Sequence, residues 1–257
     1  MIQRMMSRRI VLLAALISLA GGMAYGQGRG GRGGADQGPP PTAKASAPFD
    51  ITGYWLSIVT EDWRYRMIMP PKGDYLGIPL NPAGHKIADA WDPAKDEADG
   101  EQCKSYGAPN IMRIPGRIHI TWLDDETLKL ETDAGMQTRM FYFGTPQSQG
   151  GDWQGVSQAS WDIVAAGRGQ KPNGGSLQVV TTKFKPGYLR KNGAPYSANA
   201  VLTEYYDRTE EPNGDSYLVV TTEVRDPMYL TQPYQTSVHF RKQADASGWN
   251  PTPCSVK

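Results

Sequence analysis

The residue types that could do chemistry are scattered along this sequence and form no short catalytic motif. There is no Gly-x-Ser-x-Gly, no His-Glu-x-x-His, and no glycine loop of the phosphate- or dinucleotide-binding kind. The three histidines, His85, His119 and His239, are far apart, and a metal site would need all of them to converge. We therefore expect no metal site and no cofactor.

Glu204 and His119 are the candidate acid and base. Glu204 lies between Val201-Leu202-Thr203 and Tyr205-Tyr206, so either side of its strand gives it apolar or aromatic neighbours, which raise the pKa of a carboxyl group. His119 lies on the polar side of an expected strand. It is interpreted either as a general base or, preferably, as a solvent-facing or hydrogen-bonded sheet residue.

Several arginine and aromatic side chains are candidates for ligand binding. If the sides that carry Arg64, Arg117, His119 and Arg139 face the inside of a barrel, they form a basic cavity suited to a carboxylate or a polarised carbonyl. Glu61, Asp62 or Glu204 would then act as bases or fix the arginines. If those sides face outward, they form an ordinary solvated surface, which we favour because the opposite sides carry the apolar residues. The candidate ligand-binding residues are Trp63, Arg64, Arg117, Arg139, Tyr188 and Tyr229.

Tyr188 and Tyr229 belong to a weak internal repeat. The segments 179–189 and 219–230 each contain Val-Val-Thr-Thr, then a proline, then Tyr-Leu. Two similar strand-and-rim units would place both tyrosines at comparable positions on one edge of a barrel. Chance similarity between Val/Thr-rich strands is the alternative, because two copies are too few for a stacked repeat.

Cys103 and Cys254 predict a disulfide. Two cysteines in an exported chain meet an oxidising environment, and a bridge would hold a proline-containing C-terminal tail that otherwise frays. A catalytic thiolate is the alternative, and it would need a nearby histidine or positive dipole.

Alternation with period two dominates the chain beyond residue 48 and predicts the elements that must position these residues. It indicates about eight to ten strands, and therefore an all-β antiparallel barrel with one inserted short helix. The glycines of Ala134-Gly135-Met136 and Asn213-Gly214 predict hairpin turns. Asn81 and Pro82 begin the helix, and Asp92-Pro93 ends it. The strands are expected at 51–60, 63–69, 117–122, 127–133, 137–143, 176–184, 200–207, 216–224 and 234–242.

The segment Asp50-Ile51-Thr52-Gly53-Tyr54-Trp55 resembles the glycine-x-tryptophan opening of lipocalin-like (calycin) barrels. The resemblance implies that Trp55 closes one barrel end and that a basic residue near the last strand, Arg241, packs over it through a cation–π contact. The inserted helix and the larger number of strands depart from that family. The segments 91–96, 115–117 and 132–139 resemble exported bacterial proteins, which implies a compartment and no mechanism.

The N-terminus predicts export. Arg4, Arg8 and Arg9 precede the apolar run 10–20, which is too short to span a membrane, so residues 1–26 are interpreted as a signal peptide. Residues 27–47 are expected to be a Gly/Pro-rich flexible linker, and residues 48–257 a single barrel domain. The expected location is the periplasm or the exterior, without stable membrane insertion. The formal net charge of +1 gives no general attraction to nucleic acid.

Two functions follow from this sequence. The first is an exported lipocalin-like barrel that binds a small, largely apolar ligand bearing a carboxylate or a carbonyl group. The second is a cofactor-free isomerase, lyase or hydrolase that uses Glu204, His119 or a tyrosine together with an arginine in the barrel. A barrel filled completely by side chains would remove the enzyme.

Overall fold

The computed structural model describes residues 39–60, 62–164 and 174–256. The chain divides into two units, Met1–Pro40 and Pro41–Lys257, and everything below concerns the second unit. The predicted signal peptide, most of the predicted linker and Glu61 lie outside the described residues. Residues 41–47, also predicted as linker, contact the domain: the Trp161 indole donates to the Ala43 carbonyl oxygen at 2.8 Å, and the Lys44 amide donates to that of Asp125.

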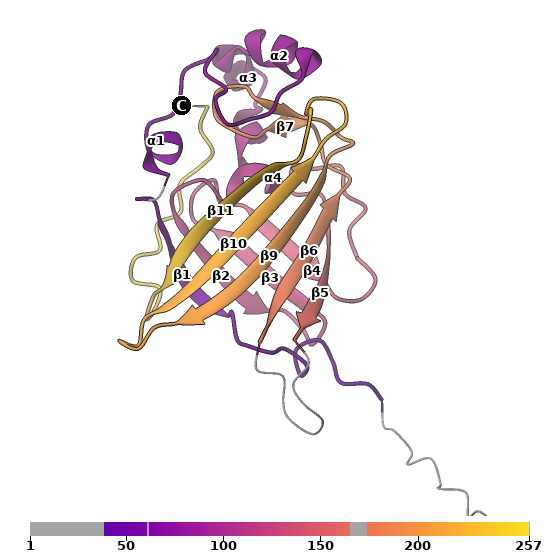
Figure 1. Cartoon of the computed structure of the whole chain (residues 1–257), viewed down its shortest axis with the longest axis vertical. Helices are drawn as coiled ribbons and strands as arrows, with labels where there is room; N and C mark the ends of the chain where they lie inside the picture. The colour runs from indigo at the N-terminus through magenta and orange to yellow at the C-terminus, as the bar shows by residue number, and fades with distance from the viewer. Residues whose placement is uncertain (1–38, 61, 165–173, 257) are drawn as a thin grey trace, which may run out of the picture. The chain divides into compact units, whose positions relative to one another are not determined.

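Within the described residues, nine strands close into a barrel in the order β1-β11-β10-β9-β6-β5-β4-β3-β2 (Figure 1). The all-β barrel predicted from alternation is therefore confirmed. One strand, β5, falls in none of the predicted segments, and the other eight overlap predicted ones. The strands are β1 (Gly53–Ile58), β2 (Arg117–Trp122), β3 (Thr127–Thr132), β4 (Thr138–Tyr142), β5 (Val156–Ile163), β6 (Gly175–Thr182), β9 (Val201–Glu210), β10 (Ser216–Arg225) and β11 (Tyr234–Lys242).

One pair of neighbouring strands departs from the predicted antiparallel arrangement. β4 and β5 are parallel, with Phe141 opposite Ser157, whereas every other described pair in the barrel is antiparallel. The connection 143–155 is long enough to return to the starting end of β4, which a parallel pair requires. Both predicted glycine turns are confirmed, because Gly135 and Gly214 adopt positive φ angles of 79° and 86° between antiparallel strands.

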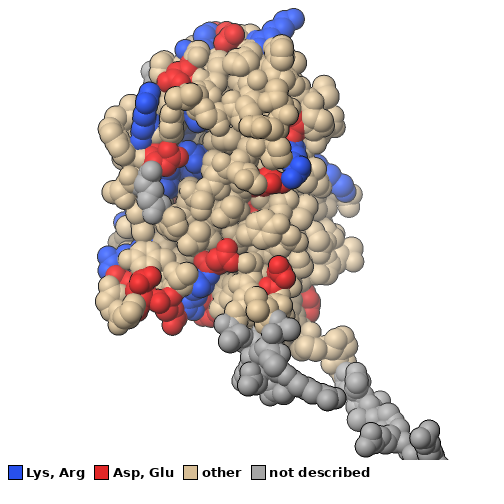
Figure 2. Space-filling model, viewed as in Figure 1, with Lys and Arg blue, Asp and Glu red and all other residues tan. Residues whose placement is uncertain are grey.

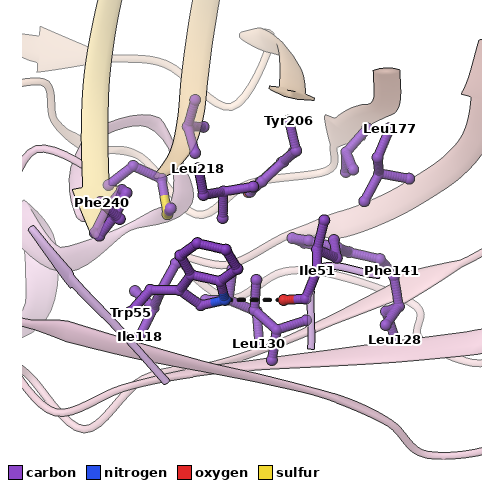
Figure 3. Close-up of a cluster of buried hydrophobic side chains, with 14 of the residues drawn as sticks. Ile51, Trp55, Ile118, Leu128, Leu130, Phe141, Leu177, Tyr206, Leu218 and Phe240 are labelled. Atoms are coloured by element: carbon purple, nitrogen blue, oxygen red, sulfur yellow. Dashed lines mark hydrogen bonds between the residues drawn. The ribbon is translucent and has the colours of Figure 1, made fainter. Parts of the chain in front are cut away.

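The barrel interior is packed with side chains and is not hollow. Figure 3 shows Trp55 lying among residues from several strands, with its indole nitrogen donating to the Ile51 carbonyl oxygen at 2.9 Å. Thirteen other barrel side chains in this cluster are 3% exposed or less, so they enclose no room for a ligand. They are Ile118, Ile120, Leu128, Leu130, Phe141, Ala159, Leu177, Val179, Tyr206, Leu218, Val220, Val238 and Phe240.

The cation over Trp55 is Lys242. Its ammonium group lies 4.5 Å from the ring centroid, whereas Arg241, the residue that the lipocalin-like resemblance implies, points to solvent and pairs with Asp215 at 2.7 Å. Neighbouring residues of a strand face opposite sides, which explains why only one of the two cations reaches the ring.

Short helices gather at one end of the barrel. They are α1 (Trp63–Arg66), α2 (Pro82–Asp89), α3 (Pro93–Ala98), the 3-10 helix η1 (Gln102–Tyr106) and α4 (Ala108–Ile111), together with the small pair β7 (Gly187–Tyr188) and β8 (Pro195–Tyr196) (Figure 1). The helix capped by Asn81 is confirmed as α2. Asp92 does not simply end it: the Asp92 side chain accepts from the amides of Ala94 and Lys95 and so begins α3.

The strand predicted over residues 63–69 is wrong. The segment forms α1 and a turn, in which the Met67 amide donates to the Trp63 carbonyl oxygen at 2.8 Å. Arg66 turns toward the barrel, because its guanidinium donates to the carbonyl oxygens of Arg113 and Ile58 at 2.9 and 2.6 Å. These hydrogen bonds take the place of the backbone hydrogen bonds to a neighbouring strand that a β-strand would form.

The segment that contains η1 and α4 closes this end of the barrel. Tyr106, Ile111 and Met112 are buried in the same cluster as the barrel interior. The disulfide Cys103–Cys254 joins this segment to the C-terminal tail, as predicted from the sequence.

Candidate functional site

Arg139 and Glu204 meet inside the barrel. Arg139 Nη1 donates to Glu204 Oε1 at 2.9 Å, and Nη2 donates to Oε2. Nη2 also donates to the Thr181 hydroxyl, the Tyr206 hydroxyl donates to Glu204, and the Arg139 guanidinium lies 4.9 Å from the Phe141 ring centroid. The outward orientation favoured for Arg139 is therefore wrong, because Glu204 on β9 supplies the charge that this guanidinium needs inside the core.

This pair is enclosed. The two side chains are 1% and 0% exposed, so no space for a substrate adjoins them. Burial lowers the pKa of Arg139, but the neighbouring Glu204 carboxylate and the Tyr206 hydroxyl together outweigh burial and hold that pKa above its usual value. Burial, and then the same carboxylate, raise the pKa of Tyr206. In this arrangement the pair connects β4 with β9 inside the core, and no observation favours a reaction there.

Arg117 and His119 lie on the outer side of β2, as favoured from the sequence. Tyr54 stacks on His119 with 3.9 Å between ring centroids, and Trp249 of the C-terminal tail packs edge-on against both. His119 Nδ1 lies 3.4 Å from a Glu131 carboxylate oxygen. The tail therefore covers this part of β2, and His119 is a partly buried surface residue outside any described cavity.

Tyr188 and Tyr229 lie near the helical end of the barrel in separate environments. The Tyr188 hydroxyl donates to Asp96 at 2.8 Å, and burial, followed by that carboxylate, raises its pKa. The Tyr229 carbonyl oxygen accepts from the Asn81 amide at the start of α2. The candidates named from the sequence are thus not brought together. Two are paired in the core, two lie on β2, Trp63 and Arg64 lie on α1, and the two tyrosines contact the helical segments.

A cavity lies between three segments at the helical end, and most of its lining residues are not among the candidates named from the sequence. Its volume is about 170 Å³. The segment at α1, the connection from α4 to β2, and the connection from β7 to β8 form its walls. In Figure 2, Lys and Arg side chains are visible at the upper left, on the side where Figure 1 places α1. We call this space the arginine cavity. It is lined by Tyr65, Arg66, Met67, Met69, Asn110, Arg113, Ile114, Pro115, Arg190 and Lys191.

Arg190 is the most unusual residue of the arginine cavity. It is only 4% exposed, yet its described partners are neutral: Nη1 donates to the Leu76 carbonyl oxygen at 3.1 Å, and the guanidinium lies 4.7 Å from the Tyr65 ring centroid. Its Nε is buried with no acceptor among the described residues. A buried charge with no counter-ion is costly, so this position favours an anion from outside the chain.

Arg113 is another buried cation of the wall, beside Arg66 and Arg190. Its Nη2 pairs with the Asp62 carboxylate, and its carbonyl oxygen accepts from Arg66 Nε at 2.9 Å. Asp62 therefore neutralises one of the cations around the arginine cavity and, through Arg113, links the α1 segment to the residues before β2.

Lys191 connects the arginine cavity to the C-terminal tail. Its ammonium group donates to the Tyr106 hydroxyl at 2.6 Å, and the same hydroxyl accepts from the Ser255 amide, one residue after Cys254. Burial raises the pKa of Tyr106, but the Lys191 ammonium group and the hydrogen bond from Ser255 together lower it more, so the net shift is downward.

The remaining lining side chains are largely apolar. Met67, Met69, Ile114 and Pro115 line the cavity together with the cationic groups. Such a mixture suits a small molecule with one anionic group and an apolar body. This site was not predictable from the sequence, because its three segments are far apart in the chain and Arg190-Lys191 stands in a loop without periodicity.

No protein-family model, no curated protein and no solved structure matches this chain. Among the described residues, none of the helices is both long and apolar enough to cross a membrane.

Proposed function

We propose that this protein binds a small, largely apolar carboxylate, and that it does so in the arginine cavity at the helical end of the barrel. The observation that carries this proposal is Arg190: a guanidinium that is 4% exposed, lines a cavity, and has neutral described partners. A carboxylate accepts two parallel hydrogen bonds from a guanidinium, which makes it a suitable counter-ion.

The cavity volume limits the ligand's buried part. A volume of about 170 Å³ is comparable to an apolar protein cavity of about 150 Å³ that accommodates benzene. The enclosed part of the ligand is therefore about the size of a benzoate or a hexanoate.

Export and a lipocalin-like relationship are part of the same proposal. The basic and apolar pattern of residues 1–26 and the Cys103–Cys254 disulfide support a periplasmic or secreted location. Trp55, buried beneath Lys242, supports the lipocalin-like relationship, although the parallel pair β4–β5 departs from a fully antiparallel barrel.

Calorimetric titration with benzoate and hexanoate, and with the neutral amides benzamide and hexanamide, tests the binding proposal. We expect the acids to bind and the amides to bind at least tenfold more weakly, because only the acids neutralise Arg190. The variant Arg190→Met should lose tenfold to a hundredfold in affinity for the acids.

Arg241→Met is the matched control, because it removes an exposed arginine that pairs with Asp215 away from the arginine cavity. A urea unfolding curve for each protein distinguishes loss of binding from loss of folding. A second cavity variant, Arg113→Met, tests another cation of the wall. Equal binding of acid and amide, or unchanged acid binding by a folded Arg190→Met variant, would contradict the proposal.

A further inference from the structure

Four large apolar side chains lie exposed beside the arginine cavity. Trp63, Met67, Ile68 and Leu76 are 54%, 58%, 56% and 62% exposed. We call these four residues the apolar rim. Isolated exposed apolar residues are ordinary, but several around one opening mark a contact surface.

Printed contacts connect the rim to the cavity. Met67 itself lines the cavity, Trp63 lies one helical turn before it, and the Trp63 carbonyl oxygen accepts from the amides of both Met67 and Ile68. Leu76 is connected through its carbonyl oxygen, which accepts from Arg190 Nη1. The rim residues therefore belong to the same two segments that contact the cavity wall, and their side chains are exposed apolar surface close to it.

The size of the cavity determines how a longer ligand would lie. About 170 Å³ encloses a carboxylate and only a few carbon atoms, by comparison with the volume that benzene occupies. Any further methylene groups must lie outside the cavity, where contact with the apolar rim is more favourable than exposure to water.

We propose that the ligand is a single-chain anionic amphiphile, an alkyl carboxylate whose head group is bound by Arg190 and whose chain lies along the apolar rim. This inference rests on the proposed function and specifies its ligand class. Charge complementarity selects an anion, because Arg190 stands at the cavity wall and its described partners are neutral. Four side chains are too few for a stable protein interface, which buries well over a thousand Å². Arg190 lies below the surface, where a free chain reaches it more easily than a head group held in a bilayer plane.

Titration with butanoate, hexanoate, octanoate and decanoate, each below its micelle-forming concentration, tests this inference. A fully buried methylene would raise affinity about fourfold. A chain that rests on the rim with one side in water should gain about twofold per methylene beyond hexanoate. Affinity that is constant from hexanoate to decanoate would overturn the inference and leave the proposed function standing.

The double variant Trp63→Ser/Ile68→Ser identifies the surface involved. It should bind hexanoate like the unmodified protein but lose the gain in affinity of the longer acids, which is about fourfold for octanoate and about sixteenfold for decanoate. Leu123→Ser is the matched control. Leu123 is 60% exposed and follows the end of β2 that lies away from the cavity, so this variant should retain the whole gain. A gain retained by the rim variant would also overturn the inference.

Sedimentation with phosphatidylglycerol vesicles separates the free amphiphile from a membrane. We expect no vesicle binding that depends on Trp63 and Ile68. Vesicle binding lost in the rim variant, combined with no binding of free decanoate, would replace the amphiphile with a lipid surface. Failure of every acid in the series, short ones included, would instead contradict the proposed function itself.

Discussion

Two buried arginines differ in what surrounds them. Arg139 has the carboxylate of Glu204, whereas Arg190 has a carbonyl oxygen and an aromatic ring. The first guanidinium is neutralised within the core and adjoins no space. The second lines a cavity and retains hydrogen-bonding capacity. This contrast at the scale of single residues is the reason for placing ligand binding at Arg190.

Removing one member of the Arg139–Glu204 pair should destabilise the fold strongly. Glu204→Gln or Arg139→Met leaves one buried group without its partner, and we expect a loss of about 3–5 kcal/mol in the free energy of unfolding. Urea unfolding measures this loss. The double variant Arg139→Met/Glu204→Leu should cost clearly less than the sum of Arg139→Met and Glu204→Leu, because it leaves no unpaired charge. Single variants with near-normal stability would show that the pair contributes little.

Removing the charge of Asp62 should strengthen the binding of an anion in the arginine cavity. Asp62→Asn removes the carboxylate that pairs with Arg113, so the cavity becomes more positive. We expect benzoate to bind about threefold more tightly, a modest change because the side chain is partly exposed and screened. Asp215→Asn, which affects the distant pair with Arg241, is the control and should leave benzoate affinity unchanged. Weaker binding by Asp62→Asn would show that Asp62 chiefly holds Arg113 in place.

Among the elements, the closing segment η1–α4 contributes both to the barrel end and to the site. It fills the barrel end with Tyr106, Ile111 and Met112, and the residues that follow it supply Arg113 to the arginine cavity. The C-terminal tail holds this segment through Cys254 and through the Ser255 amide, which donates to Tyr106. A site at the end of a filled barrel depends on such connections rather than on the strands.

The disulfide should stabilise the chain substantially. Cys103 and Cys254 are 151 positions apart. Replacing both by serine should lower the free energy of unfolding by about 4 kcal/mol, because the unfolded chain gains conformations when a long loop is opened. Urea unfolding measures the difference. Thiol counting on the denatured, unreduced protein should find no free thiol, and two free thiols per chain would contradict the bridge.

For the molecule as a whole, buried tyrosines determine the response to alkali. Burial raises the pKa values of Tyr196 and Tyr206 above the usual 10.0, and burial with Asp96 raises that of Tyr188. Above pH 10 the unfolded chain loses these protons while the folded chain keeps them. The unfolded state therefore binds fewer protons, and stability falls as pH rises.

Absorbance of tyrosinate, followed together with circular dichroism from pH 10.5 to 12, measures this effect. Burial lowers the pKa of Lys242. Its effect on stability therefore increases with pH only up to about 10.5, the usual pKa of lysine, and the chosen pH range lies above that value. We expect part of the tyrosine absorbance to appear only when the fold is lost. Complete tyrosine ionisation in a protein with unchanged circular dichroism would contradict the burial of these rings.

The sequence alone determined the elements whose residues repeat with a local period. The alternation of β9, β10 and β11, the glycine turn at Gly214 and the cap at Asn81 were all predictable, because each depends on residues close together in the chain. The short segment 63–69 was misassigned for a related reason: an alternation that short is also compatible with one turn of helix once Arg66 finds its carbonyl partners.

The tertiary structure alone decided which charges are buried and which of them meet. Glu204 was singled out by its apolar neighbours, but its pairing with Arg139 depends on the two strands lying across a closed barrel. The arginine cavity joins three segments distant in sequence, and Arg190 is notable only because folding removes it from water. Periodicity acts over a few residues, whereas desolvation and charge pairing depend on the packing of the entire domain.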